Sequence, residues 1–247
     1  MRLRALVAIA TLLPMTSIAA DITLLSGGAV EPGLHAAANA FEKQTGHSLK
    51  ITFNTAPQIQ KRIVEGGEKF DVLIAPPAVV DAVVKAGLAN AGGPTVGRVG
   101  LGVAMRDGSP VPDIASTEAL KRAVLDADAI VFNRASTGVY FEGLLRKLDV
   151  WTAIEPKTTR YPDGASVMEH VRNAKGREIA FGAITEILLY QDKGLRFVGP
   201  LPADVQNYTP YVTALTPQGN ASAAARDFVA FLATPQSKQL FTAAGVE

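Results

Sequence analysis

The sequence predicts an α/β protein of two lobes, each a mostly parallel sheet flanked by helices, with a ligand cleft between the lobes. Short apolar runs of β type alternate with helical segments along the chain, which is typical of parallel sheets with covered faces. A glycine-rich segment, 92–108, divides this alternation into two blocks. The late segments, 208–244, can return to the first block. A single doubly wound sheet is the alternative that these observations leave open.

The first block consists of three strand–helix pairs. Its first helix carries an apolar stripe from Leu34 to Phe41 at helical spacing, and Gly46 is the expected stop. Pro32 fits the first turn of this helix. Strands are expected over 21–25, 49–53 and 71–75, and helices over 31–45, 54–67 and 76–87.

The second block repeats the alternation with shorter elements. Ser116 and Thr117 form a natural N-cap pair for a helix that follows them. Further strands are expected over 99–104, 129–132, 179–181, 195–198 and 208–215. Further helices are expected over 137–148, 167–174, 186–190, 221–232 and 236–244. We therefore expect lobe 1 to comprise 21–104 and 205–247, and lobe 2 to comprise 105–204.

The first 20 residues have the order of regions of a secretory signal peptide. Arg2 and Arg4 precede an apolar run, 5–15, and small residues follow it. The run is shorter than the ~20 residues that a membrane span needs, although an N-terminal anchor is the alternative. We expect cleavage near Ala19 or Ala20, a location in the periplasm and no membrane insertion afterwards.

The composition excludes several classes of partner. Removing Arg2 and Arg4 from the 24 basic residues leaves 22 against 23 acidic residues, so the mature net charge is near −1. Without a basic stripe, neither nucleic acid nor a membrane surface is an expected partner. The chain has no cysteine, which is consistent with an oxidising compartment. We expect a monomer.

Four turns that follow strands and precede helices are the candidate binding elements. Each combines small or hydroxyl side chains with backbone N–H groups at a positive helix end, which can bind anions. Four such turns around one cleft would form an anion site with neutral walls, although Ser, Thr and Asn also serve simply as N-caps. The candidate ligand-binding residues are Ser26, Gly27, Gly28, Ala29, Asn54, Thr55, Arg134, Ser136, Thr137 and Thr185.

Three side chains at these turns suggest more specific chemistry. Arg134 lies in a helix-initiating loop, where its guanidinium could hold a carboxylate with two donors; a solvated surface arginine is the alternative. Glu186 at a helix start is either a stabilising charge near the cap or a carboxylate directed at the ligand. Tyr140, Tyr208 and Tyr211 could supply hydroxyls.

No motif for a metal, nucleotide or serine-nucleophile site is present. The histidines, His35, His47 and His170, lack metal-ligand spacing. The glycines after the first strand lack dinucleotide spacing, and neither a P-loop nor a nucleophile elbow occurs. We therefore expect no metal and no cofactor.

Several segments, in this order, give the chain a family resemblance. It resembles the molybdate-binding-protein-like group of periplasmic solute-binding proteins. The resemblance implies the two-lobed periplasmic binding protein fold, a hinge that closes on the ligand, and delivery to an ABC-type transporter permease. The segments that carry it are 22–41 with the ending Phe-Glu-Lys-Gln-Thr-Gly over 41–46, then 62–67, 71–74, 138–140 and 225–232.

The departures from this group indicate a different ligand. Molybdate binders typically present serine hydroxyls in the first two turns and a tyrosine in the last. Here Ala29, the region 56–57 and Thr185 take those places, and each buried oxyanion partner that is lost costs ~1–3 kcal/mol. The segment 183–188 is similar to that of a divergent branch of the family that includes aconitate isomerase, a periplasmic enzyme whose substrate is a tricarboxylate.

Two hypotheses follow for the function. The first is a periplasmic solute-binding protein that holds a small anion, a carboxylate rather than molybdate, for an ABC-type transporter. The second is an isomerase of the aconitate type, which interconverts cis- and trans-aconitate by an allylic proton shift. That shift needs a base near the substrate CH₂; Glu186 is the candidate, with Tyr140 as its proton partner. Fold alone does not separate the two.

Overall fold

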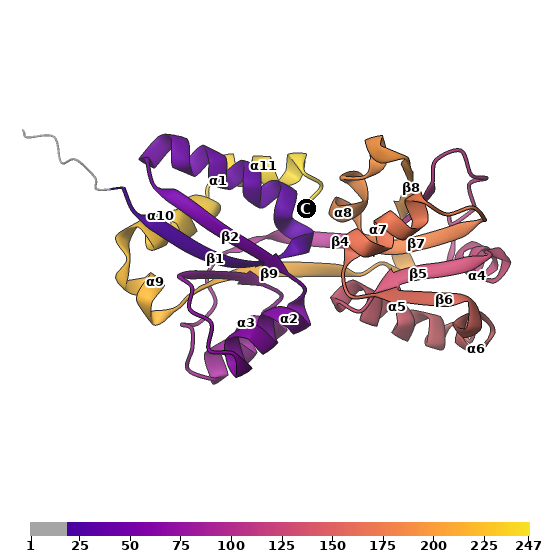
Figure 1. The fold of residues 1–247 in the computed structure, drawn as a ribbon, viewed down its shortest axis with the longest axis horizontal. Coiled ribbons are helices and arrows are strands. Elements are labelled where there is room, and N and C mark those ends of the chain that lie inside the picture. The colour runs from indigo at the N-terminus through magenta and orange to yellow at the C-terminus, as the bar shows by residue number, and fades with distance from the viewer. Residues whose placement is uncertain (1–18) are drawn as a thin grey trace, which may run out of the picture.

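A computed structural model describes residues 19–247 and shows two lobes side by side along the long axis of the molecule (Figure 1). Residues 1–18 of the expected signal peptide lie outside the described residues. The predicted α/β class is confirmed, because strands and helices alternate along the described chain.

Lobe 1 is built on a mostly parallel sheet. β1 pairs in parallel with both β2 and β3, while β9 runs antiparallel to β3 and to the first half of β4. In spatial order its strands are β2 (Ser48–Asn54), β1 (Asp21–Gly27), β3 (Val72–Ala75), β9 (Tyr208–Leu215) and β4 (Thr95–Arg106).

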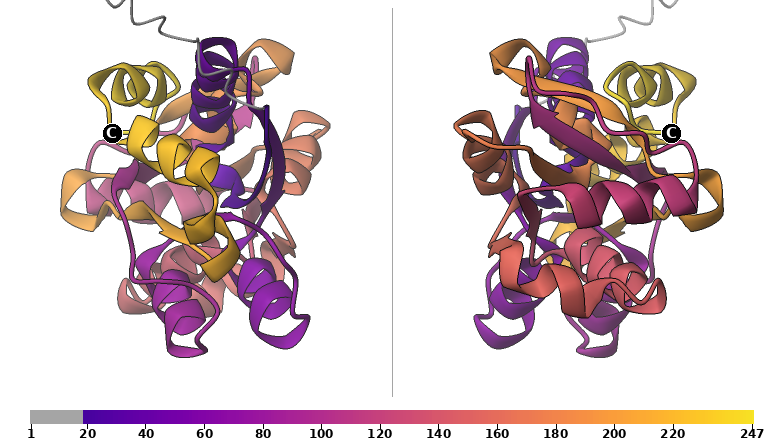
Figure 2. Two further views of the ribbon diagram at one scale, coloured as in Figure 1. Left: turned by 90° about the vertical axis from the view of Figure 1, so that its left-hand side faces the viewer. Right: turned by 90° about the vertical axis from the view of Figure 1, so that its right-hand side faces the viewer.

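Helices cover both faces of this sheet. The strands alternate their side chains between the two faces, so Leu24 packs under α1, α10 and α11, whereas Leu25 packs against α2 and α3. Figure 2 shows the same two helical layers from the end of the lobe. The helices are α1 (Glu31–Thr45), α2 (Ala56–Gln60) with a π-helical turn after it (Lys61–Glu65), α3 (Pro77–Lys85), α9 (Pro217–Ala221), α10 (Ala223–Leu232) and α11 (Pro235–Ala243).

Lobe 2 has a second sheet, in which β5 pairs in parallel with β6 and β7. The second half of β4 runs antiparallel to β7 and β8. Phe141 of α5 stacks on Phe181 of β7 with ring centroids 3.8 Å apart and anchors that helix on the sheet. The strands are β5 (Ala129–Asn133), β6 (Thr158–Tyr161), β7 (Glu178–Ala183) and β8 (Leu195–Pro200).

The helices of lobe 2 also form two layers. α4, α5 and α6 cover the face that carries Phe132, and α7 and α8 cover the face that carries Val131. Their bounds are α4 (Thr117–Asp126), α5 (Ser136–Lys147), α6 (Trp151–Ile154), α7 (Gly164–Arg172) and α8 (Ile184–Leu188).

The chain crosses between the lobes along β4 and returns before β9. β4 pairs with β9 as far as Gly100 and with β7 and β8 from Leu101 onward. We therefore propose to divide the lobes between Gly100 and Leu101, a few residues before the boundary expected from the sequence.

Candidate functional site

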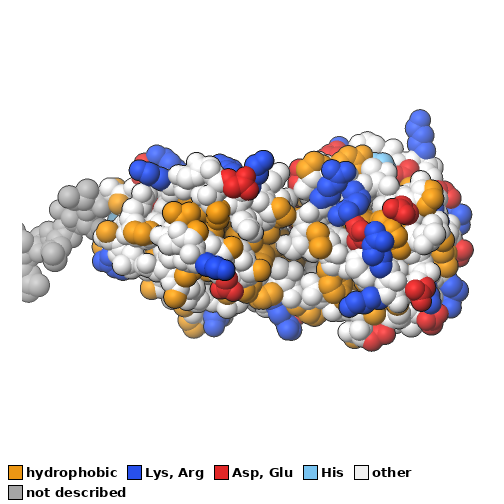
Figure 3. Space-filling model, turned by 90° about the horizontal axis from the view of Figure 1, so that it is seen from below, with side chains coloured by type: hydrophobic (Ala, Val, Ile, Leu, Met, Phe, Trp, Pro, Cys, Tyr) orange, Lys and Arg blue, Asp and Glu red, His pale blue; other side chains and the backbone are white. Residues whose placement is uncertain are grey.

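A cleft of about 350 Å³ lies between the lobes and is lined by both. Lobe 1 contributes the ends of β1 and β2, and lobe 2 contributes the ends of β5 and β7. This is the edge at which ligands bind in open α/β sheets, because helices begin there. On the side shown in Figure 3, the surface where the lobes meet has few charged side chains. A second, more open groove is flanked by Pro57, Val79 and Val139.

The structure brings most of the predicted turn residues together at this cleft. Those that line it are Gly27, Gly28, Ala29, Asn54, Thr55, Ser136, Thr137 and Glu186.

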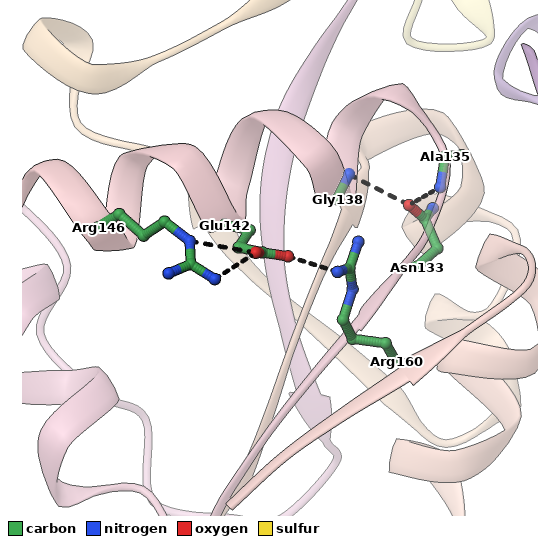
Figure 4. Close-up of polar contacts among 6 residues, drawn as sticks. All are labelled: Asn133, Ala135, Gly138, Glu142, Arg146 and Arg160. Carbon is green, nitrogen blue, oxygen red and sulfur yellow. Dashed lines mark hydrogen bonds and ion pairs between the residues drawn. The ribbon is translucent and has the colours of Figure 1, made fainter. Parts of the chain in front are cut away.

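The start of α5 shows how a helix terminus faces the cleft. The Asn133 Oδ1 atom accepts hydrogen bonds from the backbone N–H groups of Ala135 (3.0 Å) and Gly138 (3.1 Å) (Figure 4). The N–H groups of Ser136 and Thr137 therefore have no intrahelical partner. Both residues line the cleft, so this terminus can donate to an anion.

Glu186 differs from every other polar group at the cleft. Its Oε2 atom is buried and makes no hydrogen bond within residues 19–247. Burial raises the pKa of Glu186 to about 7, and the negative charges of Asp163 and Glu31 add to the shift. At neutral pH the side chain can therefore either give or take a proton.

Two glycines lie beside the Glu186 carboxyl group, and Gly164 makes room for it. A Cβ atom on Gly164 would lie 2.0 Å from Oε2, and a Cβ atom on Gly28 would lie 3.6 Å from Oε1. Gly28 belongs to lobe 1, and Gly164 begins α7 in lobe 2. The carboxyl group thus reaches across the space between the lobes.

Tyr211 on β9 also lines the cleft, and only 6% of its surface is exposed. Its ring lies so close to Gly27 that a Cβ atom there would be 2.6 Å from the ring. Burial raises the pKa of Tyr211, and the nearby Glu186 charge raises it further. The phenol is therefore a neutral hydrogen-bond donor at physiological pH.

The expectation of neutral walls is wrong, because three carboxyl groups line the cleft. Asp163 caps α7 by accepting from the Ser166 N–H (2.8 Å), and Glu31 lies 3.7 Å from His35. No lysine or arginine is among the described residues that line the cleft. Positive potential comes from helix termini alone.

Five predicted residues lie elsewhere, among them Tyr208, whose ring lies 4.3 Å from the Arg98 guanidinium. The Ser26 hydroxyl donates to the Gly27 carbonyl (3.2 Å), and the Thr185 hydroxyl donates to the Ala29 carbonyl of the other lobe (2.5 Å). Tyr140 donates to the Val205 carbonyl (2.9 Å). Arg134 is exposed and does not line the cleft.

The turn around Asp163 and Gly164 was not predicted from the sequence. This turn follows β6, a short and polar strand that has no apolar run to reveal it. An Asp-Gly pair three residues before Val167 is a sequence signal for an N-cap and could have located it. No group of three His, Asp or Glu side chains within residues 19–247 is placed to hold a metal ion.

Fold and cleft define a two-lobed ligand-binding protein. The model of the bacterial extracellular solute-binding protein family matches residues 22–247, so the chain belongs to that family. Across the described part of the chain, no helix has the length and apolarity to cross a membrane.

Individual relatives differ in what they bind or convert. The chain is 26% identical over 236 residues to an aconitate isomerase of Pseudomonas sp., covering 92% of this chain and 87% of that protein. It is similar to the periplasmic molybdate-binding protein of Azotobacter vinelandii, with a TM-score of 0.72, 17% identity and coverage of 92% and 98%. It is also similar to L-phospholactate-bound PEB3 of Campylobacter jejuni, with a TM-score of 0.68, 14% identity and coverage of 91% and 98%.

Proposed function

We propose that this protein is a periplasmic isomerase of the aconitate type, which interconverts cis- and trans-aconitate in the cleft. The observation that carries the proposal is Glu186: a buried Oε2 atom without a partner, a pKa of about 7 and a place in the cleft. An ionised carboxyl group there would repel the anion that a receptor holds, whereas a general base needs that pKa. The likeness to an aconitate isomerase supports the same reaction.

Helix termini would hold the carboxylates of the substrate. The free N–H groups of Ser136 and Thr137 begin α5, and Gly164 begins α7. Backbone donors at such ends bind anions without a lysine or an arginine. A volume of about 350 Å³ is in the range of small-molecule sites.

The proton balance of the reaction requires one group that both takes and gives a proton. The Glu186 carboxylate removes a proton from the substrate CH₂, and the electron pair spreads over the allyl unit and its carboxylate. Protonated Glu186 then returns a proton to the other end of the allyl unit, so the double bond moves by one position. The reaction needs no oxidant and no cofactor. Tyr211, which stays neutral, can donate a hydrogen bond to the charge that develops.

A receptor for an ABC-type transporter permease is the second candidate function. The family match favours it, since family members bind solutes outside the cell membrane. In this case Glu186 in its protonated form would donate to a bound carboxylate, and the ligand would leave unchanged.

Turnover of cis-aconitate, followed by chromatography, separates the two candidates. We expect the mature protein to form trans-aconitate, and we expect Glu186→Gln to lower kcat about 1,000-fold because a general base is lost. The amide resembles the protonated carboxyl group, so the affinity for aconitate should change less than about fivefold. Glu142→Gln, away from the cleft, is the matched control and should keep wild-type turnover. If the wild type does not turn over cis-aconitate but its Tm rises on adding aconitate, the isomerase is rejected and the receptor is supported.

A further inference from the structure

We propose that Glu186 sets the class of anion that the cleft accepts: it excludes compact dianions such as sulfate and molybdate, and it admits an extended polycarboxylate. The inference deepens the proposed function and rests on it, because both place the ligand beside Glu186. It adds a role in selectivity that does not depend on turnover.

The carboxyl group lies where a compact ligand could not avoid it. Its Oε2 atom contacts the start of α7 at Gly164, and its Oε1 atom faces Gly28 in the other lobe. A Cβ atom on Gly164 would overlap Oε2, and one on Gly28 would touch Oε1 in ordinary van der Waals contact. An anion that bridged the start of α7 and Gly28 of the other lobe would therefore also touch Glu186.

No basic side chain among the described residues that line the cleft compensates the charge of Glu186. The ionisable groups that face it are Asp163 before α7, Glu31 on α1, Tyr211 on β9 and Tyr190 just beyond α8. All are acids, and no lysine or arginine lines the described part of the cleft. Like charges in close contact repel strongly at the low effective dielectric constant of a protein site. A dianion beside ionised Glu186 is therefore strongly disfavoured.

The distribution of charge distinguishes the two ligand classes. Sulfate and molybdate carry two charges on one centre, so the repulsion acts on the whole ligand. A tricarboxylate carries its charges at separate points along a carbon chain. It can place carboxylates at the starts of α5 and α7, where the N–H groups lie, and present an uncharged CH₂ to Glu186. The side chain that would remove a proton from this CH₂ thus also rejects the wrong anions.

Calorimetric titration of sulfate and molybdate at pH 8 tests the inference. We expect Glu186→Gln, which keeps the shape without the charge, to bind either anion about tenfold more tightly than the wild type, because at pH 8 only about a tenth of the wild-type protein carries the neutral acid. Glu142→Gln is the matched control and should behave like the wild type. A wild type that binds either oxyanion as tightly as Glu186→Gln overturns the inference, as does a Glu186→Gln protein that binds neither.

A pH series on the wild type tests the same point without a variant. Sulfate affinity should rise about fivefold as the pH falls from 8 to the pKa of Glu186, about 7, because the neutral acid no longer repels the ligand; at lower pH the rise should level off. Affinity that does not change with pH contradicts the inference. Aconitate titrated into the same samples distinguishes the two proposals: if aconitate neither binds nor reacts, the proposed function fails whatever sulfate does.

Discussion

Two glutamates of lobe 2 have opposite surroundings. Glu142 on the flank of α5 accepts from Arg146 (2.7 Å) and from Arg160, so two guanidinium groups balance one carboxylate (Figure 4). The charged side chains that shift the pKa of Glu186 are both acids, and its Oε2 atom has no donor within residues 19–247. Arginines thus neutralise the acid outside the cleft, whereas none lines the described part of the cleft beside Glu186. An unpaired carboxyl group is costly to keep, so the contrast supports the proposed role of Glu186.

Replacing each glutamate by glutamine should change the free energy of unfolding at pH 8 in opposite directions. This is the largest expected effect. The pKa of Glu186 rises from 4.5 to about 7 on folding. Its contribution to the free energy of unfolding is therefore complete below pH 4.5 and is lost as the pH rises through 7. This loss lowers the free energy of unfolding by up to about 3 kcal/mol. At pH 8, Glu186→Gln should therefore unfold at a higher urea concentration than the wild type.

At pH 8 the free energy of unfolding of Glu142→Gln should be about 1 kcal/mol lower than that of the wild type, because Arg146 and Arg160 lose their shared partner. This variant should therefore unfold at a lower urea concentration. Urea unfolding at pH 5 and pH 8 measures both effects. Equal pH dependence in Glu186→Gln and the wild type would contradict the contrast between the two sites.

A methyl group at Gly164 should disturb the cleft without unfolding the protein. The new Cβ atom would overlap Glu186 Oε2 and displace the carboxyl group, and a misplaced base loses about 100-fold in kcat. Gly143→Ala on α5 is the control, because a Cβ atom there meets no other atom within 4 Å. Wild-type turnover in Gly164→Ala, with a native Tm, would remove the carboxyl position from the mechanism.

Arg134→Ala should have the smallest effect. The side chain is exposed and lies outside the cleft lining, so the affinity for aconitate should change less than about twofold. Calorimetry measures it directly. A tenfold loss would show that Arg134 reaches the ligand when the lobes close, and would restore the role that the sequence suggested for it.

Local signals were sufficient to predict much of this fold. α1 spans 31–45 as expected, because a proline in its first turn, an apolar stripe and Gly46 at a φ of 74° all agree. The β6 strand and the short α6 helix were not predicted, since neither has a length or pattern that stands out. Missing β6 also hid Asp163 and Gly164.

Residues of the candidate site could be predicted only where the position of the backbone is enough to bring them to the cleft. Turns that follow strands reach the cleft whatever their side chains, so Gly28, Thr55 and Ser136 were found. Side-chain direction depends on tertiary packing: Thr185 and Tyr140 donate to carbonyls of distant segments. The three converging acids come from 31, 163 and 186, and no sequence spacing links them.

The hydrogen bond from Thr185 to Ala29 has a consequence for how the molecule can open. β4 and β9 run side by side where they join the lobes, and the Thr185 bond ties α8 of lobe 2 to the 3₁₀ turn Gly28–Val30 of lobe 1. Any separation of the lobes at that turn must break this single bond, and it also draws Gly28 away from Glu186. The movement that opens the cleft to a ligand thus also frees the Glu186 carboxyl group from its contact with Gly28.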